Sequence, residues 1–436
     1  MVNFSSWGNY PIVEHSSIQS YIWRHDIPSF ADSGTYLPYG LGRSYGDSCL
    51  NDNNILIHTV QLNKFISFDA TTGILHCESG VSLEHILHEF APRGWFLPVT
   101  PGTKYITVGG AVANDVHGKN HHRRGTFGAH VKALTLLRSD GKQYYCTPTE
   151  NKELFSATIG GMGLTGLISD IAFQLLPIES TYIDNHSTKF SCVDDFFELC
   201  EDAEDEFEYT VAWIDCLATG KNLGRGHYYR GNHSKKKRKN IAKKPIGIIP
   251  FFAPEFVLNP LSIRAFNTAY YNKQFGTTIK NTVHYEPFFY PLDIVHQWNK
   301  LYGRRGFLQY QCVVPLADGS DAIKEMLARV AASGTGSFLA VLKKFGNISS
   351  PGLMSFPIEG YTLTLDFAMR GDSTLQLLQT LDDVVKKTGG RLYPAKDARM
   401  SAEIFRNGYP QWQEFSQYID PKFSSTFWRR VTKETL

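Results

Sequence analysis

Short apolar runs separated by glycine-rich turns make up most of the first 175 residues. Apolar runs bounded by turn residues predict strands, which here fall at residues 55–57, 66–68, 74–77 and 134–137. Apolar residues recur at helical spacing over residues 83–90, after the N-cap residue Ser82 and before Gly94. The pattern therefore predicts an α+β fold with one short helix among the strands.

Beyond Pro177 glycine becomes rarer and longer elements follow. An apolar stripe predicts an acidic helix over residues 193–208, and the same periodicity predicts helices over 321–330 and 373–387. Alternating apolar positions predict strands at 307–314, 338–343 and 361–367. This part of the chain is expected to form a largely antiparallel sheet backed by helices.

The first of these strands has one polar face. Gln309 and Gln311 share it, because successive side chains of a strand point to opposite faces. Two interpretations are open: a solvated sheet face, or a platform that hydrogen-bonds a polyhydroxyl ligand. From Gly390 the chain runs into a helical tail. We expect three parts, residues 1–178, 179–390 and 391–436.

Composition excludes several classes of protein. A formal net charge of +2 argues against a nucleic-acid-binding protein. The seven cysteines are an odd number without a C-x-x-C pair, which indicates reduced thiols in a cytoplasmic protein. The N-terminus lacks the pattern of a secretory signal, and the longest apolar stretch, residues 246–261, is broken by three prolines and Glu255. A membrane-spanning helix is not predicted.

Three glycine clusters are the strongest candidates for ligand contact. They cover residues 40–46, 102–110 and 160–166, and each ends a predicted strand. Glycine lets the backbone approach a ligand closely, and successive N–H groups can bind anions. The spacing of the first cluster is neither the Rossmann G-x-G-x-x-G nor the P-loop pattern. One extended phosphate-bearing ligand explains the three clusters better than three unrelated turns do.

A basic stretch follows the second cluster. His117, Lys119, His121 and His122 fall within six residues. No second group of ligand residues accompanies them at a suitable spacing, so a metal site is not predicted. Contact with a redox ring and an anionic substrate is the favoured interpretation, and a basic surface loop is the alternative.

These segments resemble the vanillyl-alcohol-oxidase (PCMH-type) family of FAD enzymes. The resemblance runs from Trp7-Gly8 almost to the C-terminus, and its most specific segments are residues 40–47, 107–122, 160–166, 307–311 and 393–399. It implies a two-part FAD-binding domain at residues 1–178, a substrate domain at 179–390, and a C-terminal segment at 391–436 that returns to the FAD-binding domain.

The resemblance also implies the residues of the site. Its cofactor-binding residues are Tyr39, Gly40, Gly42, Arg43, Ser44, Tyr45, Gly46, Pro101, Gly102, Thr103, Thr107, Gly109, Gly110, Asn114, His117, Gly118, Gly160, Gly163, Thr165, Gly166, Tyr393 and Lys396. Its substrate residues are Lys119, Trp213, Gln309, Gln311, Lys343, Thr362 and Thr364. Lys396 and His117 are the implied catalytic residues. Related oxidases with covalent FAD carry a histidine where this chain has Arg43, so non-covalent FAD is expected.

The activity implied is the oxidation of a sugar hydroxyl. Within the family the chain is most similar to oxidases of C2 of a polyprenyl-phosphate-linked pentofuranose of the ribose type. A separate NAD(P)H-dependent short-chain reductase would then complete an epimerisation in cell-wall arabinan synthesis. His117, Lys396 or a bound water could accept the hydroxyl proton. The alternatives are an alditol or aldonolactone oxidase acting on a soluble sugar, and a non-catalytic lipid-phosphate binding protein.

Residues 235–261 combine a basic run with an apolar segment. Seven Lys or Arg residues fall between 235 and 244, and Phe251, Phe252 and Phe256 follow without a periodic apolar face. One interpretation is a solvated loop. The other is a mobile lid that meets the inner face of an anionic membrane, where basic and exposed apolar residues act together.

Overall fold

A computed structural model describes residues 4–31, 33–201, 206–236 and 247–433 of the chain. Its largest sheet is antiparallel throughout and has the strand order β15-β11-β13-β12-β18-β19-β17-β20. The bounds of these strands are β11 Tyr182–Phe190, β12 Tyr209–Ile214, β13 Gly226–His233, β15 Thr278–His284, β17 Phe307–Pro315, β18 Ala340–Phe345, β19 Gly360–Ala368 and β20 Arg391–Leu392.

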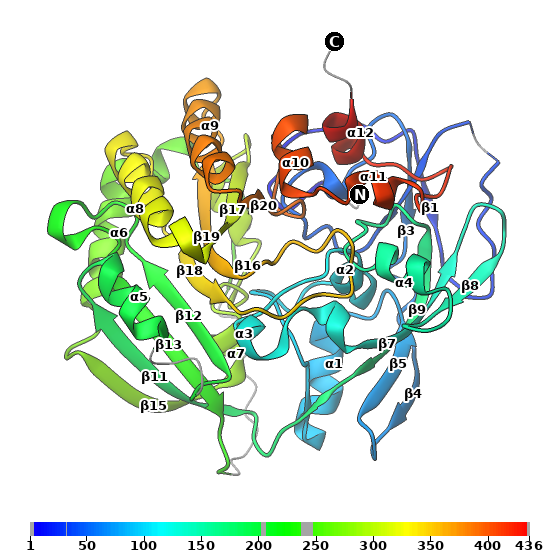
Figure 1. The fold of residues 1–436 in the computed structure, drawn as a ribbon, viewed down its shortest axis with the longest axis horizontal. Helices are drawn as coiled ribbons and strands as arrows, with labels where there is room; N and C mark the ends of the chain where they lie inside the picture. Colours follow the sequence, from blue (N-terminus) through cyan, green and yellow to red (C-terminus); the bar gives the residue numbers. More distant parts are fainter. Residues whose placement is uncertain (1–3, 32, 202–205, 237–246, 434–436) are drawn as a thin grey trace.

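Helices cover one face of this sheet (Figure 1). They are α5 Val193–Glu201, α6 Pro260–Asn272, α8 Leu316–Ser333 and α9 Asp372–Lys387. Leu308, Tyr310, Cys312 and Val314 of β17 pack into one apolar core with buried residues of α8 and α9. The alternation of β17 therefore turns Gln309 and Gln311 to the opposite face, as predicted.

The N-terminal half contains a five-stranded antiparallel sheet of order β4-β5-β9-β7-β8 and a three-stranded parallel sheet of order β1-β3-β2. Their bounds are β1 Ser17–Ser20, β2 Tyr36–Tyr39, β3 Ile55–His58, β4 Phe65–Asp69, β5 Ile74–Glu78, β7 Val131–Leu137, β8 Gln143–Cys146 and β9 Leu167–Gln174. A separate two-stranded sheet pairs β6 Trp95–Phe96 with β10 Leu176–Pro177. The α+β class is confirmed.

The helices of this half are α1 Leu83–Phe90, α2 Val108–Ala113, α3 His121–Arg124 and α4 Lys152–Thr158, and α7 Tyr285–Phe289 follows β15 later in the chain. The predicted cap of α1 is confirmed, because the Ser82 side chain accepts a hydrogen bond from the His85 N–H at 3.0 Å. Thr107 caps α2 in the same way through the N–H of Gly110.

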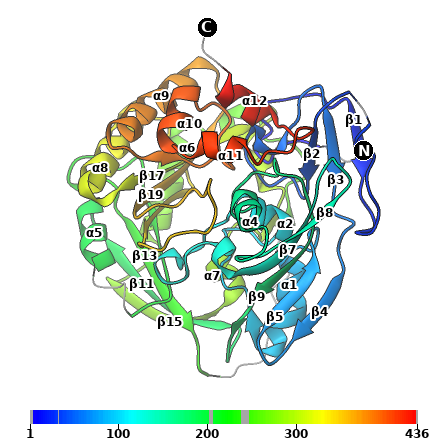
Figure 2. The ribbon, with the colours of Figure 1, turned by 45° about the vertical axis from the view of Figure 1, so that its right-hand side comes forward.

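The C-terminal helices α10 Ala402–Gly408, α11 Trp412–Ser416 and α12 Thr426–Thr432 lie beside the N-terminal strands (Figure 2). The Tyr36 N–H donates to Lys422 O at 2.7 Å, and Thr426 N–H donates to Leu50 O at 2.8 Å. Residues far apart in sequence thus share one core around Tyr36 and Phe423. The boundaries at 178 and 390 stay a prediction.

Three of the predicted elements differ in extent. The predicted helix 193–208 ends earlier: α5 runs to Glu201, residues 202–205 lie outside the described residues, and 206–208 form a turn before β12. The apolar stripe of α5 consists of Val193, Phe196, Phe197 and Cys200. The predicted strand 338–343 is shifted to Ala340–Phe345, and the helix predicted at 321–330 is longer.

The structure describes only part of the predicted lid, residues 235–261. Residues 237–246 fall outside the described residues. Gly247–Ile248 form β14, which pairs in parallel with β16 Val295–His296. Pro260 stands in the first turn of α6, where its missing N–H costs nothing, so the prolines do not prevent a helix here. Within the described residues, no helix is long and apolar enough to cross a membrane.

Candidate active site

A cavity of about 320 Å³ lies between the glycine clusters of the N-terminal half and the polar face of the eight-stranded sheet. Its walls come from residues 40–45, 100–119 and 291–298, from β17 and β18, and from residues 393–396. A second cavity, beside Leu258 and Arg370, holds only about 10 Å³, enough for a single water. The large cavity is therefore the candidate ligand site.

All but four of the predicted cofactor residues line this cavity. Gly42 adopts a φ of +61°, and a side chain on Gly102 would extend into open space, so both turns bring bare backbone to the wall. Part of the wall is also polar and unpaired: Arg43 Nε, Ser48 Oγ and Ser79 Oγ are buried and have no hydrogen-bond partner among the described residues. Such a wall suits a long ligand rich in hydrogen-bonding groups.

The four exceptions are corrections to the predicted site. Tyr39 donates its hydroxyl to Ser5 O at 2.7 Å, behind the first glycine turn. The Thr165 hydroxyl bonds that of Thr158 at 2.9 Å in the core, and the Gly160 N–H donates to Val112 O at 3.0 Å. A Cβ at Gly46 would stand 1.6 Å from Asp397 O, so this glycine allows close chain packing rather than ligand contact.

Five of the seven predicted substrate residues line the cavity, namely Lys119, Gln309, Gln311, Lys343 and Thr364. Trp213 and Thr362 do not. The Trp213 indole N–H donates to Phe338 O at 3.0 Å, and its ring contacts Tyr270. Thr362 is fully buried, and its hydroxyl accepts a hydrogen bond from Gln311 at 3.4 Å. Thr362 therefore acts on the cavity only through Gln311.

Gln311 connects β17 to His117. Its amide nitrogen lies 2.9 Å from His117 Nε2. Burial, reinforced by Lys343, His121 and Lys396, holds the pKa of His117 well below its usual value. The imidazole is thus neutral, Nε2 accepts the hydrogen bond, and the proton is on Nδ1. That Nδ1–H is buried without a partner among the described residues.

Three lysines converge on the cavity: Lys119, Lys343 and Lys396. Burial lowers the pKa of Lys119 to about 8. Burial, followed by repulsion from Lys119 and Lys396, lowers the pKa of Lys343 to about 7. Burial also lowers the pKa of Lys396 to about 7, although the carboxylate of Asp366 works in the opposite direction. Without an anion nearby, these amines are only partly protonated at neutral pH.

Asp366 is a buried carboxyl group behind the cavity wall that sequence reasoning missed. Gln309 donates its amide to Asp366 Oδ1 at 2.6 Å, and the Tyr302 hydroxyl donates to Oδ2 at 3.5 Å. Burial raises the pKa of Asp366 to about 7 against these hydrogen bonds and Lys396. A signal was present in the sequence, because Asp366 shares a strand face with Thr362 and Thr364, next to Gln309 in the register.

The turn that carries Lys396 is held on both sides. Tyr45 N–H donates to Ala395 O at 2.9 Å, and the Tyr393 hydroxyl donates to Asn114 O at 2.8 Å. Lys396 Nζ lies 3.7 Å from the ring centre of Tyr45, within cation–π range. These contacts fix the ammonium group against the first glycine cluster.

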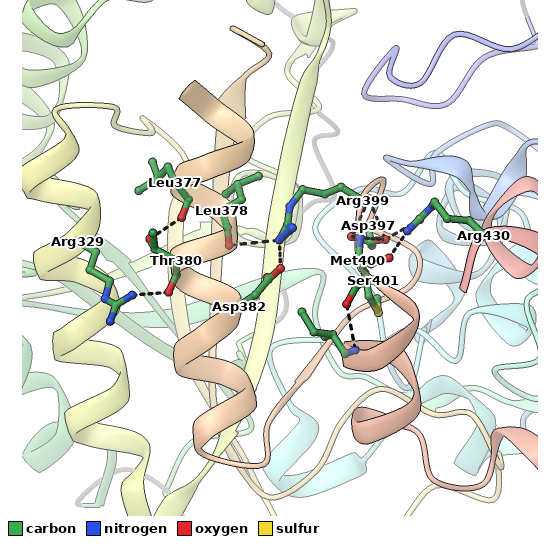
Figure 3. A network of polar contacts seen from close by, with 11 residues as sticks. Arg329, Leu377, Leu378, Thr380, Asp382, Asp397, Arg399, Met400, Ser401 and Arg430 are labelled. Carbon is green, nitrogen blue, oxygen red and sulfur yellow. Dashed lines mark hydrogen bonds and ion pairs between the residues drawn. The ribbon is translucent and has the colours of Figure 1, made fainter. Parts of the chain in front are cut away.

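Beyond Lys396, a network of ion pairs anchors the chain (Figure 3). Asp397 accepts hydrogen bonds from the N–H groups of Arg399 and Met400, and Arg430 joins it at 2.8 Å. Arg399 in turn pairs with the buried Asp382 of α9. Arg430 also forms an ion pair with Asp47 at 2.7 Å, which links this network to the first glycine cluster.

Comparison with known proteins identifies the family of this chain. Residues 30–147 match the model of an FAD binding domain. The chain is 35% identical over 408 residues to the decaprenylphosphoryl-beta-D-ribose oxidase of Mycolicibacterium smegmatis, which covers 90% of this chain and 88% of the relative. The chain belongs to this family of FAD-binding oxidases.

Other relatives agree. An uncharacterised protein of Streptomyces coelicolor is 30% identical over 372 residues, which cover 80% of this chain and 100% of the relative. A putative D-arabinono-1,4-lactone oxidase of Neurospora crassa is 27% identical over 139 residues, 32% of this chain and 24% of its own length. The protein is an FAD-dependent oxidoreductase with a PCMH-type FAD-binding domain.

The cavity fits this cofactor. The unpaired Arg43 Nε, Ser48 Oγ and Ser79 Oγ and the bare backbone at Gly102 provide the donors and the close approach that a dinucleotide needs. The described residues contain no cluster of three or more metal-ligating side chains.

Proposed function

We propose that this oxidoreductase converts C2 of a polyprenyl-phosphate-linked pentofuranose of the ribose type into the 2-keto sugar. The M. smegmatis relative is named for a decaprenylphosphoryl-linked ribose. The observation that carries the proposal is the convergence of Lys119, Lys343 and Lys396 on one cavity. Buried amines that repel one another need an anion, and a phosphate group is one that binds several amines at once.

The polar face of β17 would hold the sugar. The amide nitrogens of Gln309 and Gln311 are engaged by Asp366 and by His117, so the amide oxygens would be the groups that meet the sugar. Fixed amide oxygens accept hydrogen bonds from sugar hydroxyls with a defined orientation. Thr364 of β19, which is paired with Gln311 in the register, lines the same wall.

Removing a hydride from the sugar carbon leaves a hydroxyl proton that a protein group must accept. When bound, FAD supplies the hydride acceptor. A proton acceptor works best when its pKa is close to the working pH, which Lys396 satisfies. His117 does not, because its pKa is far lower and its Nε2 is occupied by Gln311. We assign His117 to the orientation of Gln311 and to hydrogen-bond donation from Nδ1.

Lys396 has a second task in this proposal. By the family resemblance it would lie beside the pyrimidine edge of the flavin, and the Tyr45 and Tyr393 contacts hold its turn in place. A positive charge there stabilises negative charge that develops on the ring. A separate NAD(P)H-dependent reductase would complete the epimerisation, and the enzyme would meet its lipid-linked substrate at a membrane surface.

The test is anaerobic mixing of the FAD-loaded enzyme with a panel of sugars. The panel contains a short-chain prenyl-phosphoryl ribose, a nucleotide-linked sugar, an alditol and an aldonolactone. We expect the flavin absorbance to bleach with the prenyl-phosphoryl sugar alone. Bleaching by the alditol or the lactone instead would replace the proposal with oxidation of a soluble sugar.

A further inference from the structure

Exposed large apolar side chains gather on one segment beside the cavity. Among the described residues, most of them fall between Ile248 and Ile279. We call six of them the apolar rim: Ile248, Phe251, Phe252, Phe256, Val257 and Leu261. Phe251, Phe256 and Leu261 are each about 70% exposed or more, at 69%, 75% and 77%. An exposed apolar patch of this kind marks an interaction surface.

The apolar rim borders the cavity mouth directly. β14 pairs with β16, and Val295 and His296 of β16 line the cavity. The Ile249 N–H donates to His296 O at 3.0 Å, and the Ala253 N–H donates to Lys300 O at 2.9 Å. Its backbone is therefore tied to the cavity wall while its side chains face solvent.

The charges around the rim select the occupant. From residue 247 to 280 Glu255 is the one acidic residue, against Arg264, Lys273 and Lys280. Glu255 is paired with Arg305 at 2.9 Å. Arg264 of α6 and Arg304, the neighbour of Arg305 in the chain, are exposed. Apolar side chains flanked by unopposed cations match the surface of an anionic bilayer.

We infer that the apolar rim docks on an anionic lipid bilayer and turns the cavity mouth toward it, an assignment that rests on the proposed function. A prenyl chain could then stay in the bilayer while its sugar phosphate reaches the buried lysines. The rim side chains enter the interface between headgroups and acyl chains, and Arg264 and Arg304 contact lipid phosphates.

The test compares the FAD-loaded protein with two triple variants in sedimentation with vesicles. The vesicles contain equal parts of phosphatidylcholine and phosphatidylglycerol, or phosphatidylcholine alone. The rim variant is Phe251→Ser/Phe256→Ser/Leu261→Ser. The matched control, Ile22→Ser/Trp23→Ser/Ile27→Ser, removes three exposed apolar side chains near β1, on the opposite side of the molecule from α6 (Figure 1).

We expect the rim variant to bind the anionic vesicles at least about tenfold more weakly than the wild type and the control. Arg264→Gln and Arg304→Gln should each weaken that binding roughly fivefold and leave binding to phosphatidylcholine unchanged. Retained FAD absorbance shows that each variant is folded.

Equal vesicle binding by the rim variant and the wild type would overturn the inference. The inference would also be overturned if the wild type bound no vesicles and self-associated, and the rim variant were monomeric. Bleaching by a water-soluble short-chain sugar phosphate separates the two proposals. If the wild type is bleached but does not bind vesicles, the rim assignment fails alone; if it binds vesicles through the rim but no sugar phosphate bleaches it, the proposed function fails.

Discussion

Gln309 and Asp366 face each other across β17 and β19, with the Gln309 amide donating to the buried carboxyl at 2.6 Å. Gln309 belongs to the wall that would bind the sugar. The carboxylate of Asp366 raises the pKa of Lys396. One carboxyl group therefore influences both the orientation of an amide and the ionisation of an amine.

Asp366→Asn should move the ionisation of Lys396 to lower pH. The carboxylate raises the pKa of Lys396 toward its usual value, so removing the charge lowers that pKa further below about 7. The limb of the pH profile for flavin reduction that reports Lys396 then shifts to lower pH, whether the lysine acts as a cation or as a proton acceptor. An unchanged pH profile, at an unchanged FAD content, would show that the charge of Asp366 does not control the ionisation of Lys396.

Lys396→Ala should slow flavin reduction severely while FAD still binds. Removal of one such charge costs about 10²- to 10³-fold in rate. The measurement is rapid anaerobic mixing with the short-chain substrate, and Lys280→Ala, at an exposed lysine on β15, is the control. Reduction of the Lys396 variant at the wild-type rate would contradict its role.

Substrate binding should draw protons onto the protein near pH 8. An anion held by Lys119 and Lys343 raises the pKa values of these two amines, which lie at about 8 and 7. Amines that were partly neutral therefore become protonated on binding. Calorimetric titration in buffers of different ionisation enthalpy measures this uptake. Lys343→Met should reduce it, and proton release by the wild type would argue against phosphate at the lysines.

FAD should leave the denatured protein completely. By the family resemblance, Arg43 would stand where relatives with covalent FAD carry a histidine, and its guanidinium lies 4.0 Å from the Trp7 ring centre. The one cysteine on the cavity wall, Cys49, has its pKa raised to about 12 by burial, so its thiol is a poor nucleophile. Acid precipitation should give a colourless pellet and a yellow supernatant. Yellow colour that stays with the washed pellet would show a covalent bond.

Local patterns in the sequence predicted much of the fold. The cap of α1 depends on Ser82 and its neighbours, and the two faces of β17 follow from alternation alone. Elements set by short-range patterns are therefore the ones that a single sequence reveals.

Distance along the chain limited what could be predicted of the site. The repulsion of Lys343 by Lys119 and Lys396 appears only when three separate segments meet, and no local pattern records it. Asp366 shares a strand face with Thr362 and Thr364, but its contact with Gln309 depends on the pairing of β17 with β19, which the sequence does not show. Trp213 and Thr362 share strands with cavity residues, but their side chains have partners elsewhere.

The rate of flavin bleaching by a short-chain prenyl-phosphoryl ribose carrying deuterium at C2 tests the central claim most directly. If the enzyme removes hydride from C2, bleaching is slower with C2 deuterium than with hydrogen, deuterium at C3 changes nothing, and the 2-deoxy sugar does not bleach the flavin. Equal rates with hydrogen and deuterium at C2, together with bleaching by the 2-deoxy sugar, would contradict the account.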